Sequence, residues 1–232
     1  MGDLPVTQLR RTAARRRERA VAGDRAPSGP ARRGSVGGYP FSTLPDYLRP
    51  RLRLVFVGLN PSLYSVERGH YFARSTNRFW PALSRSMLSA PVRAAVGRLA
   101  LGPDDDRLLL RFGIGFTDVV KTPSRGAASL RRSDFRTWAP LLLRRLIQMR
   151  PLTACFHGLT AYRGFVEYGL GREAVRCRLG AQPIAVGSTR LYVVPNPSPA
   201  NARYSIDDLI RWYDRLAAFL GGARSANRGR GG

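Results

Sequence analysis

The sequence predicts a three-layer α/β/α sandwich around a mostly parallel central sheet. Four apolar runs, at 52–60, 112–120, 151–158 and 189–196, have the length and composition of strands. The first is nearly continuously apolar, as in a strand that is buried on both faces. Strands that alternate with helical segments are typical of a parallel sheet covered by helices on both sides.

The segments between these runs predict the helices. Asn77 can cap a helix over 78–88, because an asparagine side chain can accept a hydrogen bond from the first helical turn. Helices are also predicted at 141–149, 159–169 and 205–220, where apolar residues recur at helical spacing. No internal repeat is visible, so we expect one folded domain.

The two ends of the chain differ in composition from the middle. Residues 1–38 hold nine arginines and almost no large apolar residue, so they cannot bury enough surface to offset the entropy of ordering. We expect a disordered arginine-rich arm there, a catalytic domain at 39–221 and a disordered Gly/Arg tail at 222–232. The arm is either a solvated tail or a contact to nucleic-acid phosphates.

The charge of the chain points to a polyanionic partner. The 232 residues contain 39 basic and 15 acidic side chains, for a formal net charge of +24. Such an excess favours nucleic acid as the partner. The alternative is codon usage in a GC-rich genome, because every basic residue except Lys121 is an arginine.

The composition also excludes several classes of protein. Two cysteines, Cys155 and Cys177, are too few for a disulfide framework, a Cys₄ zinc site or an iron–sulfur cluster. No run of about 18 apolar residues is present, so we expect no membrane span. We expect no metal and no cofactor.

Two of the predicted strands end on a similar loop. Gly-Leu-Asn-Pro-Ser stands at 58–62, and a second Asn-Pro-Ser stands within 194–203. Functional loops of a parallel sheet lie beyond the carboxyl ends of its strands, so both loops are expected to face one crevice. Either Asn-Pro alone is compatible with an ordinary turn, but the pair predicts a site.

These residues resemble the mismatch-specific uracil-DNA and thymine-DNA glycosylases of the uracil-DNA glycosylase superfamily. The resemblance covers roughly residues 50 to 220 and rests on VFVGLNPSLYSVERGHYFARSTNRFW, GFTDVVKTPS and GSTRLYVVPNPS, in that order. It implies the same three-layer fold. It also implies an enzyme that flips a base out of DNA and hydrolyses its N-glycosidic bond.

The resemblance assigns roles to individual residues. Asn60 matches the asparagine that positions the attacking water, and Phe72 matches the aromatic residue on which the base stacks, with Tyr71 as the alternative. Backbone N–H groups near Ser62 would meet the pyrimidine oxygens. The substrate-binding residues implied in this way are Gly58, Leu59, Ser62, Ser65, Tyr71, Phe72 and Asn196.

This sequence departs from the family pattern at two places. Asp118 stands where the enterobacterial pattern has a lysine, and a carboxylate there could accept the proton of the water. The alternative is a structural carboxylate that caps a loop or pairs with Lys121 or an arginine. The segment that fills the vacated base stack reads Pro-Ala-Asn-Ala-Arg, which has little bulk. The DNA-binding residues predicted at this loop are Ser198, Pro199, Ala200, Asn201 and Arg203.

Other polar and aromatic residues are given structural roles. We expect His157 to be a core histidine at the end of its strand, and Phe79 and Trp80 to be core residues of the first long helix. His70 precedes the aromatic pair and is a candidate DNA contact. Lys121 is expected to point away from the site or to contact phosphate.

The sequence therefore predicts a monofunctional uracil-DNA glycosylase that prefers mismatched or single-stranded uracil and initiates base-excision repair. Its expected partner is DNA containing uracil or related mismatched bases. We expect a monomer in the bacterial cytoplasm, associated with the nucleoid through DNA. One alternative is a non-catalytic nucleic-acid-binding module with the same fold. Another is a hydrolase of free nucleotides or nucleosides, which would not need the basic arms.

Overall fold

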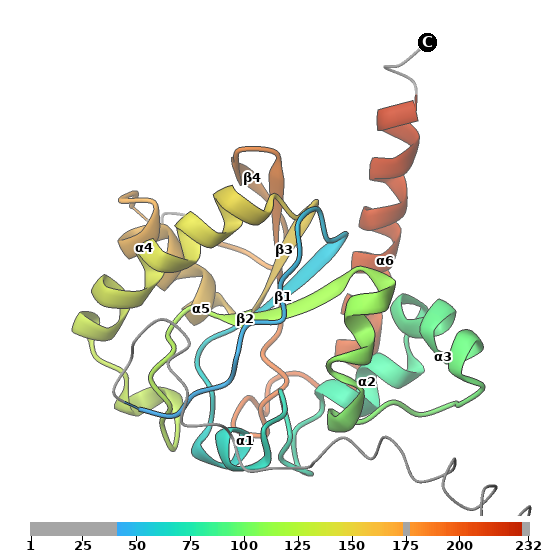
Figure 1. The fold of residues 1–232 in the computed structure, drawn as a ribbon, viewed down its shortest axis with the longest axis horizontal. Coiled ribbons are helices and arrows are strands. Elements are labelled where there is room, and N and C mark those ends of the chain that lie inside the picture. Colours follow the sequence, from blue (N-terminus) through green and yellow to red (C-terminus); the bar gives the residue numbers. More distant parts are fainter. Residues whose placement is uncertain (1–40, 174–176, 229–232) are drawn as a thin grey trace, which may run out of the picture.

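The computed structural model describes residues 41–173 and 177–228, and their strands form one sheet. The strands are β1 Leu54–Gly58, β2 Ile114–Asp118, β3 Thr153–His157, β4 Gly180–Val186 and β5 Thr189–Val194. They lie in the order β2-β1-β3-β5-β4, and β4 alone among these five runs antiparallel to its neighbour. The predicted mostly parallel sheet is confirmed (Figure 1). The predicted arm at 1–38 lies outside the described residues.

Helices and single turns connect the strands. The α-helices are α1 Leu63–Arg68, α2 Phe79–Arg85, α3 Ala90–Val96, α4 Arg132–Met149, α5 Leu159–Gly164 and α6 Ile206–Arg228. The shorter turns are η1 Met87–Ser89, η2 Pro103–Asp105, η3 Leu108–Phe112, η4 Ala127–Ser129 and the π-helical η5 Phe165–Gly169. Within the described residues, none of these helices combines the length and the hydropathy needed to cross a membrane.

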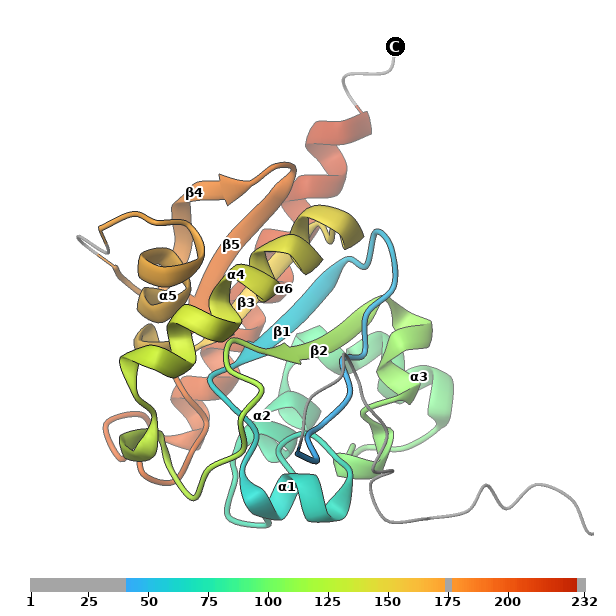
Figure 2. The same cartoon turned by 60° about the vertical axis from the view of Figure 1, so that its left-hand side comes forward.

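The continuous apolar run of β1 reflects burial on both faces of the sheet. Leu54 and Phe56 pack into one core with residues of α2, α3 and α6, whereas Val55 and Val57 pack into a second core with α4 and α5. Successive side chains of a strand point to opposite faces, so both sets must be apolar here. Figures 1 and 2 show the helices on the two sides of the sheet, which confirms the predicted three layers.

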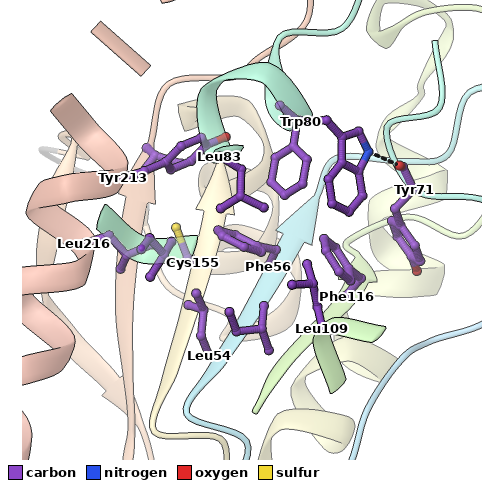
Figure 3. Close-up of a cluster of buried hydrophobic side chains, with 14 of the residues drawn as sticks. Leu54, Phe56, Tyr71, Trp80, Leu83, Leu109, Phe116, Cys155, Tyr213 and Leu216 are labelled. Atoms are coloured by element: carbon purple, nitrogen blue, oxygen red, sulfur yellow. Dashed lines mark hydrogen bonds between the residues drawn. The ribbon is translucent and has the colours of Figure 1, made fainter. Parts of the chain in front are cut away.

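Aromatic rings fill the core between the sheet and α2. The ring of Phe56 lies 5.2 Å from that of Phe79 and 5.7 Å from that of Phe116, measured between centroids. Trp80 Nε1 donates a 2.9 Å hydrogen bond to the backbone oxygen of Tyr71 (Figure 3). Phe79 and Trp80 are buried, as predicted. This packing fixes the segment around Tyr71 against the carboxyl ends of the strands.

Helix α4 begins at Arg132, whereas the sequence pattern predicts a helix only from residue 141. Pro140 lies inside the helix and cannot donate the usual backbone hydrogen bond. Trp138 and Ala139, which precede it, are buried against the sheet. Tertiary packing therefore compensates for the bond that the proline removes.

The sequence analysis did not predict strand β4. Its residues alternate between intermediate and exposed positions, and Pro183 stands in its middle. The register shifts between Ala181 and Ala185, as expected for a strand with a proline at the edge of a sheet.

Helix α6 continues to Arg228, beyond the predicted end of the domain at residue 221. The predicted disordered tail at 222–232 therefore overlaps the end of this helix, and residues 229–232 lie outside the described residues. Ala, Arg and Asn residues in this stretch are compatible with helix, and the preceding turns, which are packed on the sheet, supply the nucleus that a short helix lacks.

Gly115 of β2 allows the chain before β1 to pack tightly against the sheet. A Cβ atom at Gly115 would lie 2.2 Å from the backbone oxygen of Tyr47 and 2.6 Å from Leu52 Cδ1. We expect Gly115→Ala to lower the free energy of unfolding by about 1–3 kcal/mol, measured by urea denaturation, because the backbone must shift. Gly102→Ala is the matched control, since its Cβ would meet nothing within 4 Å. Equal stability of the two variants would contradict this packing.

Candidate active site

A cleft of about 800 Å³ opens at the carboxyl ends of the parallel strands. Both Asn-Pro-Ser loops border it, as the strand order requires. The cleft is lined by every predicted site residue, namely Gly58, Leu59, Asn60, Ser62, Ser65, Tyr71, Phe72, Asp118, Asn196, Ser198, Pro199, Ala200, Asn201 and Arg203. The structure thus brings them together, and their individual roles stay predictions.

The side chain of Asn60 is held in one orientation. Its Nδ2 atom donates to the backbone oxygen of Thr122 at 3.1 Å, to Ser124 Oγ at 2.8 Å and to the backbone oxygen of Pro61 at 3.2 Å. The hydroxyl of Ser124 donates to the backbone oxygen of Gly126, so it must accept from Asn60. An amide turned the other way would place its oxygen against these acceptors. Oδ1 is therefore the atom left to interact with a molecule in the cleft.

Asp118 lies next to the start of the same loop. It ends β2 and pairs in register with Gly58, the last residue of β1. A Cβ atom at Gly58 would lie 2.4 Å from Asp118 Oδ1, so the absence of a side chain at Gly58 makes room for the carboxylate. Asp118 is 3% exposed, and burial raises its pKa to about 6, although the Lys121 ammonium acts in the opposite direction. At pH 7 the carboxylate is largely ionised.

Lys121 lies behind Asp118 and does not line the cleft, which agrees with the expectation that it points away from the site. The alternative, a contact to phosphate, is wrong because Lys121 is only 1% exposed. Its Nζ atom lies 2.9 Å from Asp46 Oδ1, 3.5 Å from Asp118 Oδ2 and 3.4 Å from the Tyr71 hydroxyl. The position of Lys121 in the interior was not predictable from the sequence because its closest partner is Asp46, a partly buried residue before β1 that no motif marks.

Phe72 and Tyr71 differ in their access to the cleft. Tyr71 is 2% exposed, and its hydroxyl donates to the backbone oxygen of Pro45 at 3.0 Å, so most of the ring belongs to the core. Phe72 is partly exposed and stacks on Phe79, with centroids 4.2 Å apart. Its φ of 54° is rare for a bulky residue, and such conformations concentrate at functional sites. Phe72 is therefore the better placed of the two to meet a planar ligand.

The serines after the first Asn-Pro mainly organise the loop. Ser62 Oγ accepts a 3.0 Å hydrogen bond from the backbone N–H of Ser65 and caps α1. The two hydroxyl groups lie 3.0 Å apart, and Ser65 is buried. The side chain of Ser62 is thus occupied by the cap and its carbonyl accepts from the backbone N–H of Val66. The contact between its backbone N–H and a ligand stays a prediction.

The second Asn-Pro-Ser loop is built as a turn around its asparagine. Asn196 Oδ1 accepts from the backbone N–H of Ser198 at 2.9 Å, and Asn201 Nδ2 donates to the backbone oxygen of Asn196 at 3.0 Å. Because Oδ1 is used within the loop, the Nδ2 group is the part of Asn196 that can donate to a ligand. Pro199 and Ala200 are exposed at the tip of the loop.

Arg78 anchors this loop to α2, a role that the sequence analysis did not foresee. Its guanidinium donates to the backbone oxygens of Ser198 at 2.7 Å and Asn201 at 2.9 Å. It also donates to the backbone oxygens of Pro197 and Tyr204. Four carbonyls from one loop therefore share one cation, and hydrogen bonds from a charged donor are the stronger kind.

We expect Arg78→Met to loosen the loop without unfolding the domain. Each hydrogen bond to a charged group contributes about 1.5–3 kcal/mol, so amide exchange across 197–204 should speed up about 10-fold or more in hydrogen–deuterium exchange mass spectrometry. Arg85→Met is the matched control on the same helix, because Arg85 forms an exposed pair with Asp207. Unchanged exchange in Arg78→Met would show that the loop does not depend on this anchor.

The histidines occupy different environments. His157 is 2% exposed, its Nε2 lies 3.1 Å from the Tyr213 hydroxyl, and burial lowers its pKa to about 3. It is a core histidine, as predicted, yet it also borders the cleft. His70 Nδ1 lies 3.3 Å from Asp106 Oδ2, and its Nε2 lies 3.2 Å from Asp104 Oδ1. The sequence pattern, from which we predicted a DNA contact for His70, did not indicate these two acidic partners.

The charges around the cleft are strongly biased. Asp118 is the only acidic residue among the described residues that line it, whereas Arg74, Arg125 and Arg203 are exposed at its border. Of these three, only Arg203 was predicted as a DNA contact. Arg74 lies within the first motif and Arg125 directly follows the second, but neither was given a role. Over the described residues, no group of three or more histidine, cysteine or acidic side chains is placed to hold a metal ion.

A neutral amide next to a carboxylate is suited to orienting a water molecule, and the arginines around the opening suit a polyanion. Together with the three-layer fold, this arrangement is that of a DNA glycosylase. Residues 45–217 match the family described as the Uracil DNA glycosylase superfamily, and the chain belongs to this family.

The chain is also similar to a solved structure. This is the solution NMR structure of a provisionally named uracil DNA glycosylase from Methanosarcina acetivorans. The two share 21% sequence identity at a TM-score of 0.47, over 75% of this chain and 97% of that chain.

Proposed function

We propose that the protein is a monofunctional uracil-DNA glycosylase of the mismatch type, which removes uracil from G·U pairs or single strands and initiates base-excision repair. The observation that carries this proposal is the placement of Asn60 and Asp118 at the ends of two hydrogen-bonded strands, beside one cleft. One side chain presents an oriented amide oxygen, and the other presents a carboxylate that is ionised at neutral pH.

The proposed reaction uses a water molecule held between these two groups. Asn60 Oδ1 accepts a hydrogen bond from the water. This contact directs the oxygen of the water molecule toward C1′ of the deoxyribose. As the bond from C1′ to the base nitrogen breaks, uracil leaves with the bonding electrons as an anion, and the sugar becomes cationic. The water oxygen bonds to C1′, and the ionised Asp118 stabilises the cation and accepts the proton.

The remaining residues bind and orient the substrate. Phe72 stacks on the extruded base, a contact worth about 1–3 kcal/mol in proteins that bind single strands. Backbone N–H groups near Ser62 recognise the pyrimidine oxygens, and Asn196 contacts the sugar through its Nδ2. The exposed Arg74, Arg125 and Arg203 bind phosphates.

Hydrolysis without a covalent intermediate is supported by the position of Lys121. A glycosylase that also cleaves the DNA strand needs an amine nucleophile. Lys121 is the only lysine of the chain, and its ammonium is buried in contact with Asp46. It is therefore not available to attack the sugar.

The loop tip supports a preference for weakly paired uracil. Pro199 and Ala200 offer little bulk to fill the space that a flipped base leaves, so the cost of unpairing is poorly offset. That cost, a few kcal/mol, is smallest for mismatched or single-stranded bases. Thymine should be a poor substrate, because its methyl group must fit next to the buried Ser65.

The test is single-turnover cleavage of labelled oligonucleotides followed by alkali treatment, with uracil opposite guanine, opposite adenine and in a single strand, and with thymine opposite guanine. We expect G·U and single-stranded uracil to be cleaved fastest, and EDTA to leave the rates unchanged. Cleavage of A·U as fast as G·U would refute the proposed selectivity. Tight binding without any cleavage would favour the non-catalytic module instead.

A further inference from the structure

A cluster of buried charges lies behind Asp118, on the side away from the cleft. Lys121 is in its centre, between Asp118 and Asp46. Asp46 Oδ1 also accepts from the Thr117 hydroxyl at 2.7 Å, and its Oδ2 lies 3.1 Å from Arg145 Nε. Two carboxylates and two cations thus balance each other: Asp118 and Lys121 are buried, whereas Asp46 and Arg145 are partly exposed. Neither loop motif includes Asp46 or Arg145.

We propose that Lys121 is a positioning residue that keeps Asp118 ionised and turned toward the cleft, and that Asp46 holds Lys121 in place for this purpose. The proposal rests on the proposed function, in which Asp118 accepts the proton of the water. Lys121 acts through Asp118 and does not itself touch the substrate.

The distances within the cluster carry the argument. Lys121 Nζ is 2.9 Å from Asp46 but 3.5 Å from Asp118, so its close ion pair is with the residue away from the cleft. A lysine that served only to neutralise Asp118 would form its shortest contact there. A close pair would also make Asp118 a weak base, because an opposite charge in contact favours the ionised form. The longer separation keeps Asp118 ionised at neutral pH while leaving it able to take a proton.

Among the described residues, the charged and titratable groups that act on Asp118 are Lys121, Asp46 and Tyr71, whose side-chain hydrogen bond also lowers the pKa of Asp118. Lys121 follows β2, Asp46 comes from the segment before β1, and Tyr71 comes from the segment after α1. The Asp46 charge raises the pKa of Asp118 and the Lys121 charge lowers it. Burial raises the pKa of Tyr71 well above its usual range, so this phenol stays neutral and supplies no competing charge.

Two substitutions should move the ionisation of Asp118 in opposite directions. Lys121→Met removes the cation and should raise the titration midpoint of Asp118 by about one pH unit or more. Asp46→Asn removes a negative charge and frees Lys121 to approach Asp118, and it should lower that midpoint. A charge that did not act on Asp118 would leave the midpoint unchanged when it is removed.

The experiment is an NMR titration of the full chain labelled with ¹³C at aspartate carboxyl carbons, with the Asp118 resonance assigned by its loss in Asp118→Asn. We expect a midpoint of about 6 in the wild-type protein, a higher one in Lys121→Met and a lower one in Asp46→Asn. Arg85→Met, which removes an exposed ion pair on α2, is the control that should leave the midpoint unchanged.

An unchanged midpoint in Lys121→Met would overturn the proposal. If that variant does not fold, Asp46→Asn decides: a lower midpoint supports the proposal, and an unchanged one overturns it. The titration needs no substrate, so it separates the two claims. A protein that shows both shifts but releases no uracil keeps the role of Lys121 and loses the proposed function. A protein that releases uracil but shows neither shift keeps the proposed function and loses the role of Lys121.

Discussion

Asp118→Asn should lower the single-turnover rate of uracil release by about 10²-fold or more, because the amide cannot accept the proton of the attacking water. Asparagine has nearly the same shape, so it fits beside Gly58, where space is limited. The rate should be measured at saturating enzyme on a G·U oligonucleotide. Asp207→Asn, at an exposed carboxylate on α6, is the control and should keep full activity. Full activity in Asp118→Asn would remove this residue from the mechanism.

The pH dependence of the same variant gives a second readout. The wild-type rate should fall as the pH drops through about 6, since protonation of Asp118 removes the base. This decrease at low pH should be absent in Asp118→Asn.

The raised pKa of Asp118 also makes the stability of the folded protein depend on pH. The folded protein favours the protonated carboxyl, so the stability that this group contributes is present below about pH 4 and lost as the pH rises through about 6.

Asn60→Ala should also reduce the single-turnover rate by about 10²-fold or more, because the water loses the acceptor that orients it. Asn60→Asp should be nearly as slow, although it is the same size. A carboxylate there would face the backbone oxygens of Thr122 and Pro61 with no proton to donate, so its orientation would be lost.

Ser124, in the segment that follows β2, provides a graded control for Asn60. Ser124→Ala removes one of the three acceptors around Nδ2 and leaves the other two, so we expect a loss of only about 10-fold. If Asn60→Asp kept the wild-type rate, the orientation of the amide would have no part in catalysis. If Ser124→Ala were as slow as Asn60→Ala, the hydroxyl would act directly.

Most of the fold could be predicted because its strands are marked by composition. β1 is apolar throughout and β3 has an apolar centre, since each is buried on both faces. β4 was missed because an edge strand has one exposed side and tolerates Pro183, so its pattern resembles a loop. The first half of α4 was missed because Pro140 is unfavourable in an isolated helix, and only packing against the sheet compensates for it.

The site was predictable only where its residues follow one another in a motif. Asn60 and Asp118 end strands and lie within recognisable segments. Their supporting contacts join distant parts of the chain: Lys121 and Asp46 are 75 residues apart, and Arg78 and Ser198 are 120 residues apart. Hydrophobic periodicity carries no information about such pairs, because both partners are polar and their burial is decided by the fold.

In the proposed mechanism, Asn60 and Asp118 together drive hydrolysis of the bond between uracil and deoxyribose. The most direct test of this mechanism is to quantify free uracil by mass spectrometry after the full chain is incubated with G·U DNA in EDTA, with the Asn60→Ala/Asp118→Asn double variant run in parallel. We expect one uracil released for each abasic site formed by the wild-type protein, and almost none from the folded double variant. Equal release by both proteins, or none by either, would contradict it.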